Sequence, residues 1–293
     1  MKRYLKAVCI QGGPNTKSKE ENLNRAIKLL DKASKERPDF VTFSELFNTP
    51  YFCVGRYKER FFDWAEPIPG PTTELLGKKA ELYGCNIIAP LFEKGIVEGE
   101  YYNSAVVIGA DGNLIEGALL DGRAVTCYRK NHIPFVPSID LNEKPYFKPG
   151  PGFPVFRTDR ADIGILICYD RLFLEGWRAL ALQGAQIVFL VSAVPGWWGP
   201  TGDKFTFPQR SMALQNQLFI VACNKGGREV VNEVETLFFG KSCVVDPFGE
   251  IITQAPENEG PSIISATLDL KAISKARKTL QIYLDRRPDI YCL

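Results

Sequence analysis

The feature that most constrains the fold of this chain is a regular alternation of short apolar strands with amphipathic helical segments. Residues 5–11 form a β-rich run, and apolar residues then recur at helical spacing through residues 23–33. Pro38 ends this helix, and residues 39–43 form another short apolar strand. A strand–helix–strand unit of this kind predicts α/β layers, in which helices pack on the faces of a sheet.

The same rhythm continues and predicts one domain, residues 1–293, built around two related sheets. We expect further strands over 86–92, 125–129, 161–167, 186–192, 218–224 and 262–268, helices over 72–83, 174–181, 208–217 and 270–284, and hairpins that join 101–109 to 114–120 and 240–246 to 250–254. No linker separates the two halves of the chain. The stretch 131–154 is rich in proline and glycine, and such irregular segments inside a compact domain are usually functional or mobile.

Composition and charge narrow the classes of partner. The 36 basic and 34 acidic side chains nearly balance without a basic cluster, so we expect neither a nucleic acid nor an acidic membrane surface as partner. No apolar run approaches the roughly 20 residues of a membrane span, and the apolar stretch near the N-terminus is too short for a signal peptide. The eight cysteines are scattered without a CxxC pair, and one histidine leaves few ligands for zinc. These features predict a cytoplasmic protein without a metal site.

Three polar residues lie at the ends of predicted strands: Glu45, Lys130 and Cys168. Each has a plain explanation when taken alone, because charged residues at strand ends are commonly exposed and a free cysteine is commonly a small buried side chain. In open α/β sheets, however, ligands bind beyond the carboxyl ends of the strands. If these strands are neighbours, a carboxylate, an ammonium group and a thiol converge on one crevice.

The residues around Cys168 favour a reactive thiol. Cys168 to Arg171 form a predicted strand-to-helix turn, where backbone N–H groups and a helix N-terminus favour the thiolate and offer donors to an oxyanion. Glu45 is then a candidate general base, which takes the thiol proton and later returns it to a departing amine. Lys130 is a candidate for stabilising the oxyanion, since that role requires a fixed positive charge.

Three segments, in this order and widely spaced, resemble the signature segments of the nitrilase superfamily of carbon–nitrogen hydrolases. They are residues 43–47 (Phe-Ser-Glu-Leu-Phe), 128–134 (Tyr-Arg-Lys-Asn-His-Ile-Pro) and 167–171 (Ile-Cys-Tyr-Asp-Arg), and residues 246–250 resemble that family's late hairpin. The resemblance implies a four-layer αββα sandwich, in which two mixed sheets are flanked by helices. It also implies a Glu45-Lys130-Cys168 triad, a covalent thioester or thioimidate intermediate, no cofactor, and a homodimer or larger homo-oligomer.

Within that family the chain looks most like the N-carbamoyl amino acid hydrolase and β-ureidopropionase branch. Residues 142–147 (Asn-Glu-Lys-Pro-Tyr-Phe) resemble the Asn-Glu segment of carbamoyl-hydrolysing members, although the loop is slightly longer than in β-ureidopropionases. The resemblance therefore implies that Glu143 is a fourth catalytic side chain. In that role Glu143 orients the lysine and the substrate amide.

Arg171 is the residue that indicates a substrate with a carboxylate. It stands three residues after the expected nucleophile, where the resemblance places an arginine that binds the substrate carboxylate, and a guanidinium suits a carboxylate bidentately. The alternative is a surface ion pair with Asp170 or Glu175. Relatives that act on N-carbamoylputrescine, whose far end is cationic, are expected to lack a cation here.

These observations predict hydrolysis of an N-carbamoyl amino acid to the free amino acid, carbon dioxide and ammonia. Three alternatives stay open: an aliphatic amidase or nitrilase on an uncharged substrate, an N-carbamoylputrescine amidase, and a catalytically silent binding protein on the same fold. The presence of the cysteine, the glutamate and the lysine together argues against the silent protein.

Further candidates for the substrate side of the site are His132, Tyr169, Trp197 and Asn224, with a weaker case for Arg210. His132 is the only histidine, so it either supports the site or acts as the base of a Cys-His pair. The tryptophan pair at 197–198 either walls the pocket or packs at a subunit contact, to which the apolar helix faces and the C-terminal tail would also contribute.

Overall fold

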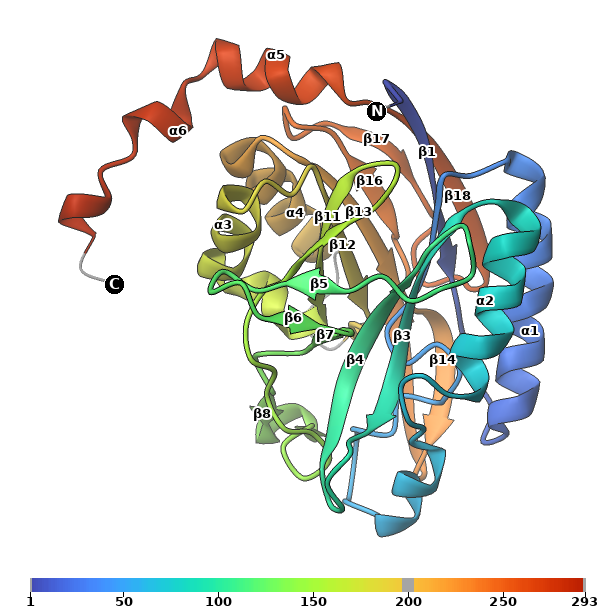
Figure 1. The fold of residues 1–293 in the computed structure, drawn as a ribbon. Coiled ribbons are helices and arrows are strands. Elements are labelled where there is room, and N and C mark those ends of the chain that lie inside the picture. The colour runs from blue at the N-terminus through green and yellow to red at the C-terminus, as the bar shows by residue number, and fades with distance from the viewer. Residues whose placement is uncertain (1, 197–202, 292–293) are drawn as a thin grey trace.

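The computed structural model describes residues 2–196 and 203–291, which form two β-sheets packed face to face between two layers of helices (Figure 1). The first sheet contains β1 (Tyr4–Gln11), β2 (Phe40–Phe43), β3 (Asn86–Lys94), β4 (Tyr101–Ile108), β7 (Tyr128–Arg129) and β18 (Ser262–Asp269). Their order is β18-β1-β2-β3-β4-β7. Helices α1 (Lys19–Ala33) and α2 (Pro71–Tyr83) cover the outer face of this sheet.

The second sheet has its own layer of helices on the opposite side of the molecule. It contains β5 (Gly117–Ala118), β6 (Ala124–Val125), β10 (Val155–Arg157), β11 (Asp162–Ile167), β12 (Ile187–Ser192), β13 (Phe219–Asn224), β16 (Cys243–Val245) and β17 (Ile251–Gln254), in the order β17-β16-β13-β12-β11-β10-β5-β6. Helices α3 (Leu174–Leu182) and α4 (Asp203–Asn216) cover it (Figure 1). The predicted αββα sandwich of two mixed sheets is confirmed.

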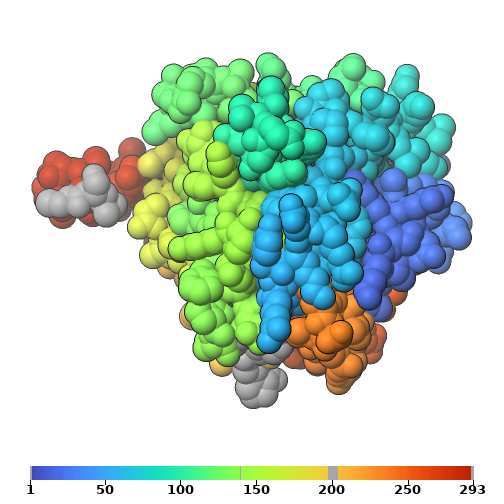
Figure 2. Space-filling model, turned by 90° about the horizontal axis from the view of Figure 1, so that it is seen from below, coloured from blue at the N-terminus to red at the C-terminus, as the bar shows by residue number. Residues whose placement is uncertain are grey.

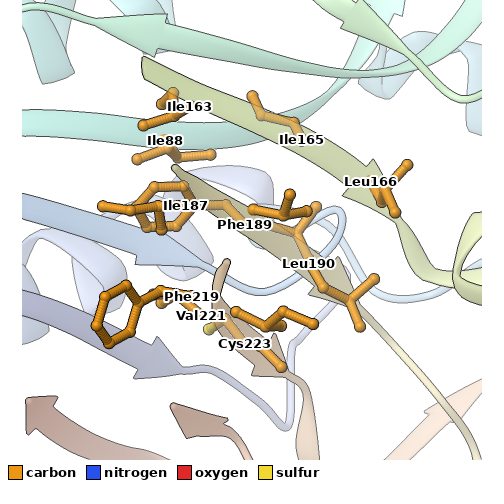
Figure 3. Packing of buried hydrophobic residues seen from close by; sticks show 14 of the residues in the cluster. Ile88, Ile163, Ile165, Leu166, Ile187, Phe189, Leu190, Phe219, Val221 and Cys223 are labelled. Atoms are coloured by element: carbon orange, nitrogen blue, oxygen red, sulfur yellow. The ribbon is translucent and has the colours of Figure 1, made fainter. Parts of the chain in front are cut away.

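The apolar core between the sheets sets their relative position. Figure 3 shows Ile88 of β3 among Ile163, Ile187 and Phe189 of the second sheet, and all four side chains are fully buried. Strands β1 to β3 are parallel to one another, and so are β11 to β13. Because the carboxyl ends of parallel strands lie at one edge of a sheet, the residues that follow β2 and β11 are brought to the edge where ligands bind in such folds.

Two expectations for the middle of the chain are wrong. Residues 101–120 do not form one hairpin, because after a single bridge between Ile108 and Leu114 the chain leaves β4, and β5 joins the second sheet beside β10. The expected strand over 125–129 is also split: β6 pairs with β5, whereas β7 pairs with β4. The chain thus passes from one sheet to the other and back before it reaches Lys130.

Three smaller differences concern the second half. Pro208 lies within α4 rather than at its start, so the helix lacks one interior hydrogen bond there. The final helix is divided into α5 (Lys271–Thr279) and α6 (Ile282–Asp285). An additional hairpin, β14 (Gly226–Val231) with β15 (Val234–Phe239), was not expected from the sequence.

The C-terminal segment, drawn in red in Figures 1 and 2, is an arm that is tied to the body at its start: Ile273 and Ala276 of α5 are buried in the core, and Tyr283 Oη of α6 donates to the carbonyl oxygen of Asn216 at 2.6 Å. The arm consists of α5, α6 and a short turn at Pro288–Ile290. Across the described ranges, the helices are too short or too polar to span a bilayer.

Candidate active site

Cys168 lies at a strained turn directly after β11. Its backbone φ is +48°, a left-handed conformation that is uncommon for any residue other than glycine. The residue opens a short 3-10 helix (Cys168–Leu172), so the side chain leaves the direction of the strand. The thiol side chain is 7% exposed and lines a cavity. Strain of this kind is concentrated at functional sites, because the surrounding structure must hold it in place.

Lys130 is fully buried between two carboxylates. Its Nζ donates to Glu45 Oε1 at 3.0 Å and to the two Glu143 carboxylate oxygens at 2.7 and 2.8 Å. Burial by itself lowers the pKa of Lys130, but the charges of Glu143 and Glu45 outweigh burial and hold this pKa well above its usual value. Lys130 is therefore a permanent cation in a site from which water is excluded.

Glu45 is fixed by two further donors. Asn103 Nδ2 donates to Glu45 Oε1 at 2.7 Å, and the backbone N–H of Ala193 donates to Oε2 at 2.9 Å. Asn103 comes from β4 of the first sheet, whereas Ala193 follows β12 of the second. The carboxylate thus lies at the junction of the two sheets in one defined orientation.

Glu143 is held by the Tyr51 hydroxyl as well as by Lys130. Tyr51 Oη donates to Glu143 Oε1 at 2.6 Å, and both side chains are buried. Burial raises the pKa of Glu143 to about 7, although the charge of Lys130 and the Tyr51 hydrogen bond act in the opposite direction. Glu143 is therefore the group in this cluster that changes its charge near neutral pH.

The expectation that the turn keeps Cys168 as a thiolate is wrong. Burial and the nearby charge of Glu45 raise the pKa of the Cys168 thiol to about 12, and Lys130 and Arg171 compensate only in part. The resting residue is thus a neutral thiol, and its proton must be taken by a base when it attacks a substrate. Glu45 is the carboxylate whose charge acts most strongly on that thiol.

The raised thiol pKa leads to a first prediction. Labelling of Cys168 by iodoacetamide is expected to become about tenfold faster per pH unit between roughly pH 7 and 9, because the reactive thiolate fraction grows in that proportion below the pKa. Mass spectrometry of peptides measures the rate. Cys223, which is buried between the sheets, is the internal control and stays unlabelled in the folded protein. A rate that does not change with pH in this range would contradict the raised pKa.

The cavity beside Cys168 is small and partly apolar. Its polar lining comes from Tyr51, Glu143, Cys168, Tyr169 and Arg171, and the rest comes from Pro134, Val136, Leu141 and residues 193–195. Its volume is about 30 Å³, so the space directly beside the thiol is narrow.

Arg171 lies inside the site and not on the surface. The side chain is 3% exposed, so an exposed ion pair with Asp170 or Glu175 is not its role. Nη1 donates to the carbonyl oxygen of Cys168 at 2.8 Å and lies 3.9 Å from Cys168 Sγ. Arg171 thus supports the turn that presents the thiol and also lines the cavity.

His132 lies outside the Glu45–Lys130–Glu143 cluster. Its Nδ1 lies 2.7 Å from Asp170 Oδ1, its backbone N–H donates to the same oxygen, and its ring stacks on Phe173 at 3.6 Å. Asp170 in turn accepts hydrogen bonds from Tyr128 Oη and from the backbone N–H of Ile167. This arrangement suits a supporting residue that fixes the turn after the thiol.

The remaining sequence candidates differ in position. Tyr169 lines the cavity. Asn224 is buried at the end of β13, where its Oδ1 accepts the backbone N–H of Val194, so it acts on the cavity wall through the main chain. Arg210 bonds to Gly249 O on the outer side of the second sheet. Trp197 and Trp198 lie outside the described residues.

Two residues of the cluster, Tyr51 and Asn103, were missed at the sequence level. Tyr51 lies in an irregular segment without periodicity, and no local pattern indicates that it reaches Glu143. Asn103 did carry a signal, since it and Ser104 are polar residues within a strand whose other side chains are mostly apolar and buried. A buried polar side chain requires a partner, and here the partner is Glu45.

Comparison with known proteins identifies the family of the chain. The sequence profile of the carbon–nitrogen hydrolase family matches residues 6–278. An N-carbamoylputrescine amidase from Solanum lycopersicum is 35% identical over 92% of this chain and 88% of its own length, and an omega-amidase from Xenopus tropicalis is 32% identical over 93% and 92%. The crystal structure of a carbon–nitrogen hydrolase from Helicobacter pylori G27 superposes with a TM-score of 0.88 at 29% identity, over 98% of this chain and 97% of that one.

Proposed function

Because the chain belongs to the carbon–nitrogen hydrolase family, we propose that it hydrolyses a small carbamoyl or amide compound through a covalent intermediate on Cys168. The observation that supports this most is the buried Glu45–Lys130–Glu143 cluster beside a neutral thiol in a small cavity. A binding protein has no physical need for two desolvated carboxylates around one lysine, whereas a hydrolase needs both a base and an electrophilic cation.

In the proposed reaction, Glu45 takes the proton of Cys168 while the sulfur electron pair forms a bond to the carbonyl carbon. The carbonyl π electrons move to oxygen, and the negative charge that develops there is stabilised by Lys130. The carbon–nitrogen bond then breaks, and the leaving nitrogen takes the proton from Glu45. Glu45 next takes a proton from water, whose oxygen attacks the carbonyl carbon of the thioester. The carbon–sulfur bond breaks, the acid product is released, and Glu45 returns the proton to the Cys168 sulfur. For a carbamoyl substrate this acid is carbamic acid, which breaks down to carbon dioxide and ammonia.

For the substrate we propose an N-carbamoyl amine, with N-carbamoylputrescine as the first compound to test. The relatives support this alternative over the N-carbamoyl amino acid expected from the sequence, since N-carbamoylputrescine amidases from four plants are 33–35% identical to this chain. An N-carbamoyl amino acid is the second candidate because Arg171 brings a guanidinium to the cavity.

Substitution of Arg171 distinguishes the two candidates. For Arg171→Met we expect kcat/KM to fall by a similar factor, on the order of tenfold, on N-carbamoylputrescine and on N-carbamoyl-β-alanine, because Arg171 supports the Cys168 turn in both reactions. Ammonia release measures both rates. Arg178→Met, whose guanidinium bonds to Gln215 O on the outer helices, is the matched control and should change neither rate.

Other outcomes of this substrate panel have definite meanings. A loss confined to the ureido acid would assign Arg171 to carboxylate binding and establish the second candidate. Ammonia release from simple amides or nitriles alone would point to the uncharged-substrate class. No release from any of these compounds by the folded protein would contradict the proposed function.

A further inference from the structure

A second buried ion pair lies outside the catalytic cluster. Lys225 directly follows β13, Glu229 belongs to β14, and their charged atoms are 3.1 Å apart. The side chains are 0% and 1% exposed. A buried ion pair adds little net stability compared with apolar side chains of the same size, because both charges lose their hydration. A contribution to stability therefore explains the presence of this ion pair poorly. Its contacts point instead to a role in holding a neighbouring segment of main chain.

The pair binds the main chain of a neighbouring segment. Glu229 Oε1 accepts the backbone N–H of Tyr51 at 2.5 Å, and Glu229 Oε2 accepts the backbone N–H of Asn15 at 2.8 Å. Lys225 Nζ donates to the carbonyl oxygen of Thr49 at 3.3 Å. Hydrogen bonds to an ionised carboxylate are about twice as strong as neutral ones. The two charges thus hold residues 49–51 by both a donor and an acceptor.

The segment held in this way connects two members of the catalytic cluster. It begins after Glu45, turns at Leu46 with a φ of +48°, and ends at Tyr51, whose hydroxyl donates to Glu143. The Asn15 side-chain amide donates to the carbonyl oxygens of Phe47 and Thr49. Because the segment has no β-ladder or helix to fix it, these side chains hold its main chain in place, while the Tyr51 ring packs against Phe238.

We propose that the Lys225–Glu229 ion pair is a positioning device for the active site: it fixes Tyr51, and the Tyr51 hydroxyl in turn orients Glu143 toward Lys130. This inference rests on the proposed function, since it assigns a role within the same site. Lys225, Glu229 and Tyr51 are positioning residues here. The ion pair does not touch the reacting atoms and acts only through the segment 46–51.

The device has a consequence for the pH dependence of the reaction. The ionisable groups that act on Glu143 are Lys130 and Glu45, together with Tyr51, Cys53 and Cys168 from the adjoining segments. The Tyr51 hydrogen bond lowers the pKa of Glu143, so loss of this bond raises the pKa further. The ionised form that holds Lys130 then appears only at higher pH, and the acidic limb of the kcat profile moves upward.

A double-mutant cycle tests the proposal. Tyr51→Phe and Glu229→Gln are each expected to lower kcat on the order of tenfold, with a smaller change in KM, and to move the acidic limb to higher pH. Because Glu229 acts through the Tyr51 hydroxyl, the double variant should lose little more than either single variant. Glu235→Gln is the matched control, since Glu235 forms an exposed ion pair with Arg228 on the same hairpin, and it should leave kcat and the pH profile unchanged.

Multiplicative losses in the double variant, or a Glu229→Gln variant with an unshifted pH profile, would overturn the proposal. If Glu229→Gln does not fold because Lys225 is left as an unpaired buried charge, the Lys225→Met/Glu229→Gln variant removes both charges and must show the same kcat loss and pH shift. The labelling rate of Cys168 by iodoacetamide provides a readout without substrate. If the wild type hydrolyses nothing, the proposed function fails. The positioning role then still requires that Tyr51→Phe and Glu229→Gln each change the labelling rate of Cys168 by the same factor, and that the double variant show no further change.

Discussion

Replacement of Cys168 by alanine is expected to abolish ammonia release from every carbamoyl and amide substrate that the wild type accepts, with a loss in kcat of at least about 10⁴-fold. The reason is that no other group of the cluster is free to form the covalent bond, because the carboxylates of Glu45 and Glu143 are both engaged in ion pairs with Lys130. Steady-state ammonia assays at saturating substrate measure the loss. Since the side chain is buried in a small cavity, the variant should fold and keep the cluster intact.

Cys85→Ala is the matched control for this substitution. Cys85 is also buried, but it lies directly before β3, on the far side of the first sheet from the cavity. The control should retain the wild-type kcat and lose only the modest stability that a deleted buried sulfur contributes. If Cys168→Ala kept more than a few per cent of the activity, a covalent mechanism through this thiol would be untenable.

The second large effect is expected for Lys130→Met, which removes the cation and keeps the length of the side chain. We expect kcat to fall by about 10³-fold, because the charge opposite the developing oxyanion is lost. The free energy of unfolding should also fall, by about 3–5 kcal/mol, because two buried carboxylates are left without their common partner. Urea denaturation followed by circular dichroism measures the stability term separately from the kinetics.

The stability loss in Lys130→Met should depend on pH in a defined direction. In the wild type, Lys130 lowers the pKa of Glu143, so without the lysine this pKa rises further above its value in the unfolded chain. The folded variant then binds a proton more tightly than the unfolded one, so its stability is greatest at acidic pH and falls as the pH rises through the folded pKa. We therefore expect a larger loss at about pH 8 than at about pH 5.

Lys79→Met is the control for the removal of a lysine from an ion pair. Lys79 pairs with Asp31 between α1 and α2, where both side chains are partly exposed. Such a pair contributes little, so the control should lose less than about 1 kcal/mol and keep its activity. A Lys130→Met variant that is as stable as this control at both pH values would show that the cluster is not desolvated.

The convergence of Glu45, Lys130 and Cys168 could be predicted only in part from the sequence, because it depends on short strands and on how two sheets pack together. Glu45 follows β2 of the first sheet and Cys168 follows β11 of the second, and each strand belongs to a parallel set whose carboxyl ends lie at one edge of its own sheet. The layer architecture followed from the same alternation of strands and helices. Local patterns were sufficient here because a helix with one buried face shows apolar residues at helical spacing, and a fully buried strand shows a continuous apolar run.

The rest depends on contacts that local patterns do not record. The passage of the chain between sheets at β5 and β6 is set by two-residue strands, which are too short to show a periodicity. Tyr51 and Glu229 are brought together across the whole fold, and neither position has an unusual neighbourhood in the sequence. The expected thiolate failed for a related reason: the turn favours it locally, but burial and a distant carboxylate, Glu45, outweigh the turn.

The positioning of residues 46–51 by the Lys225–Glu229 ion pair also determines how late during synthesis the site can be completed. The bond from Ala193 to Glu45 spans 148 residues, and the bond from Asn15 to Glu229 spans 214. Cys168 is therefore synthesised before Ala193 and Glu229, and the site cannot be completed until both have been added to the growing chain. Premature termination before β14 would leave a fragment that lacks Glu229 and also β18, the strand that pairs with β1 in the first sheet. Contacts of such long range also slow folding, so full activity should appear only in the last step of refolding.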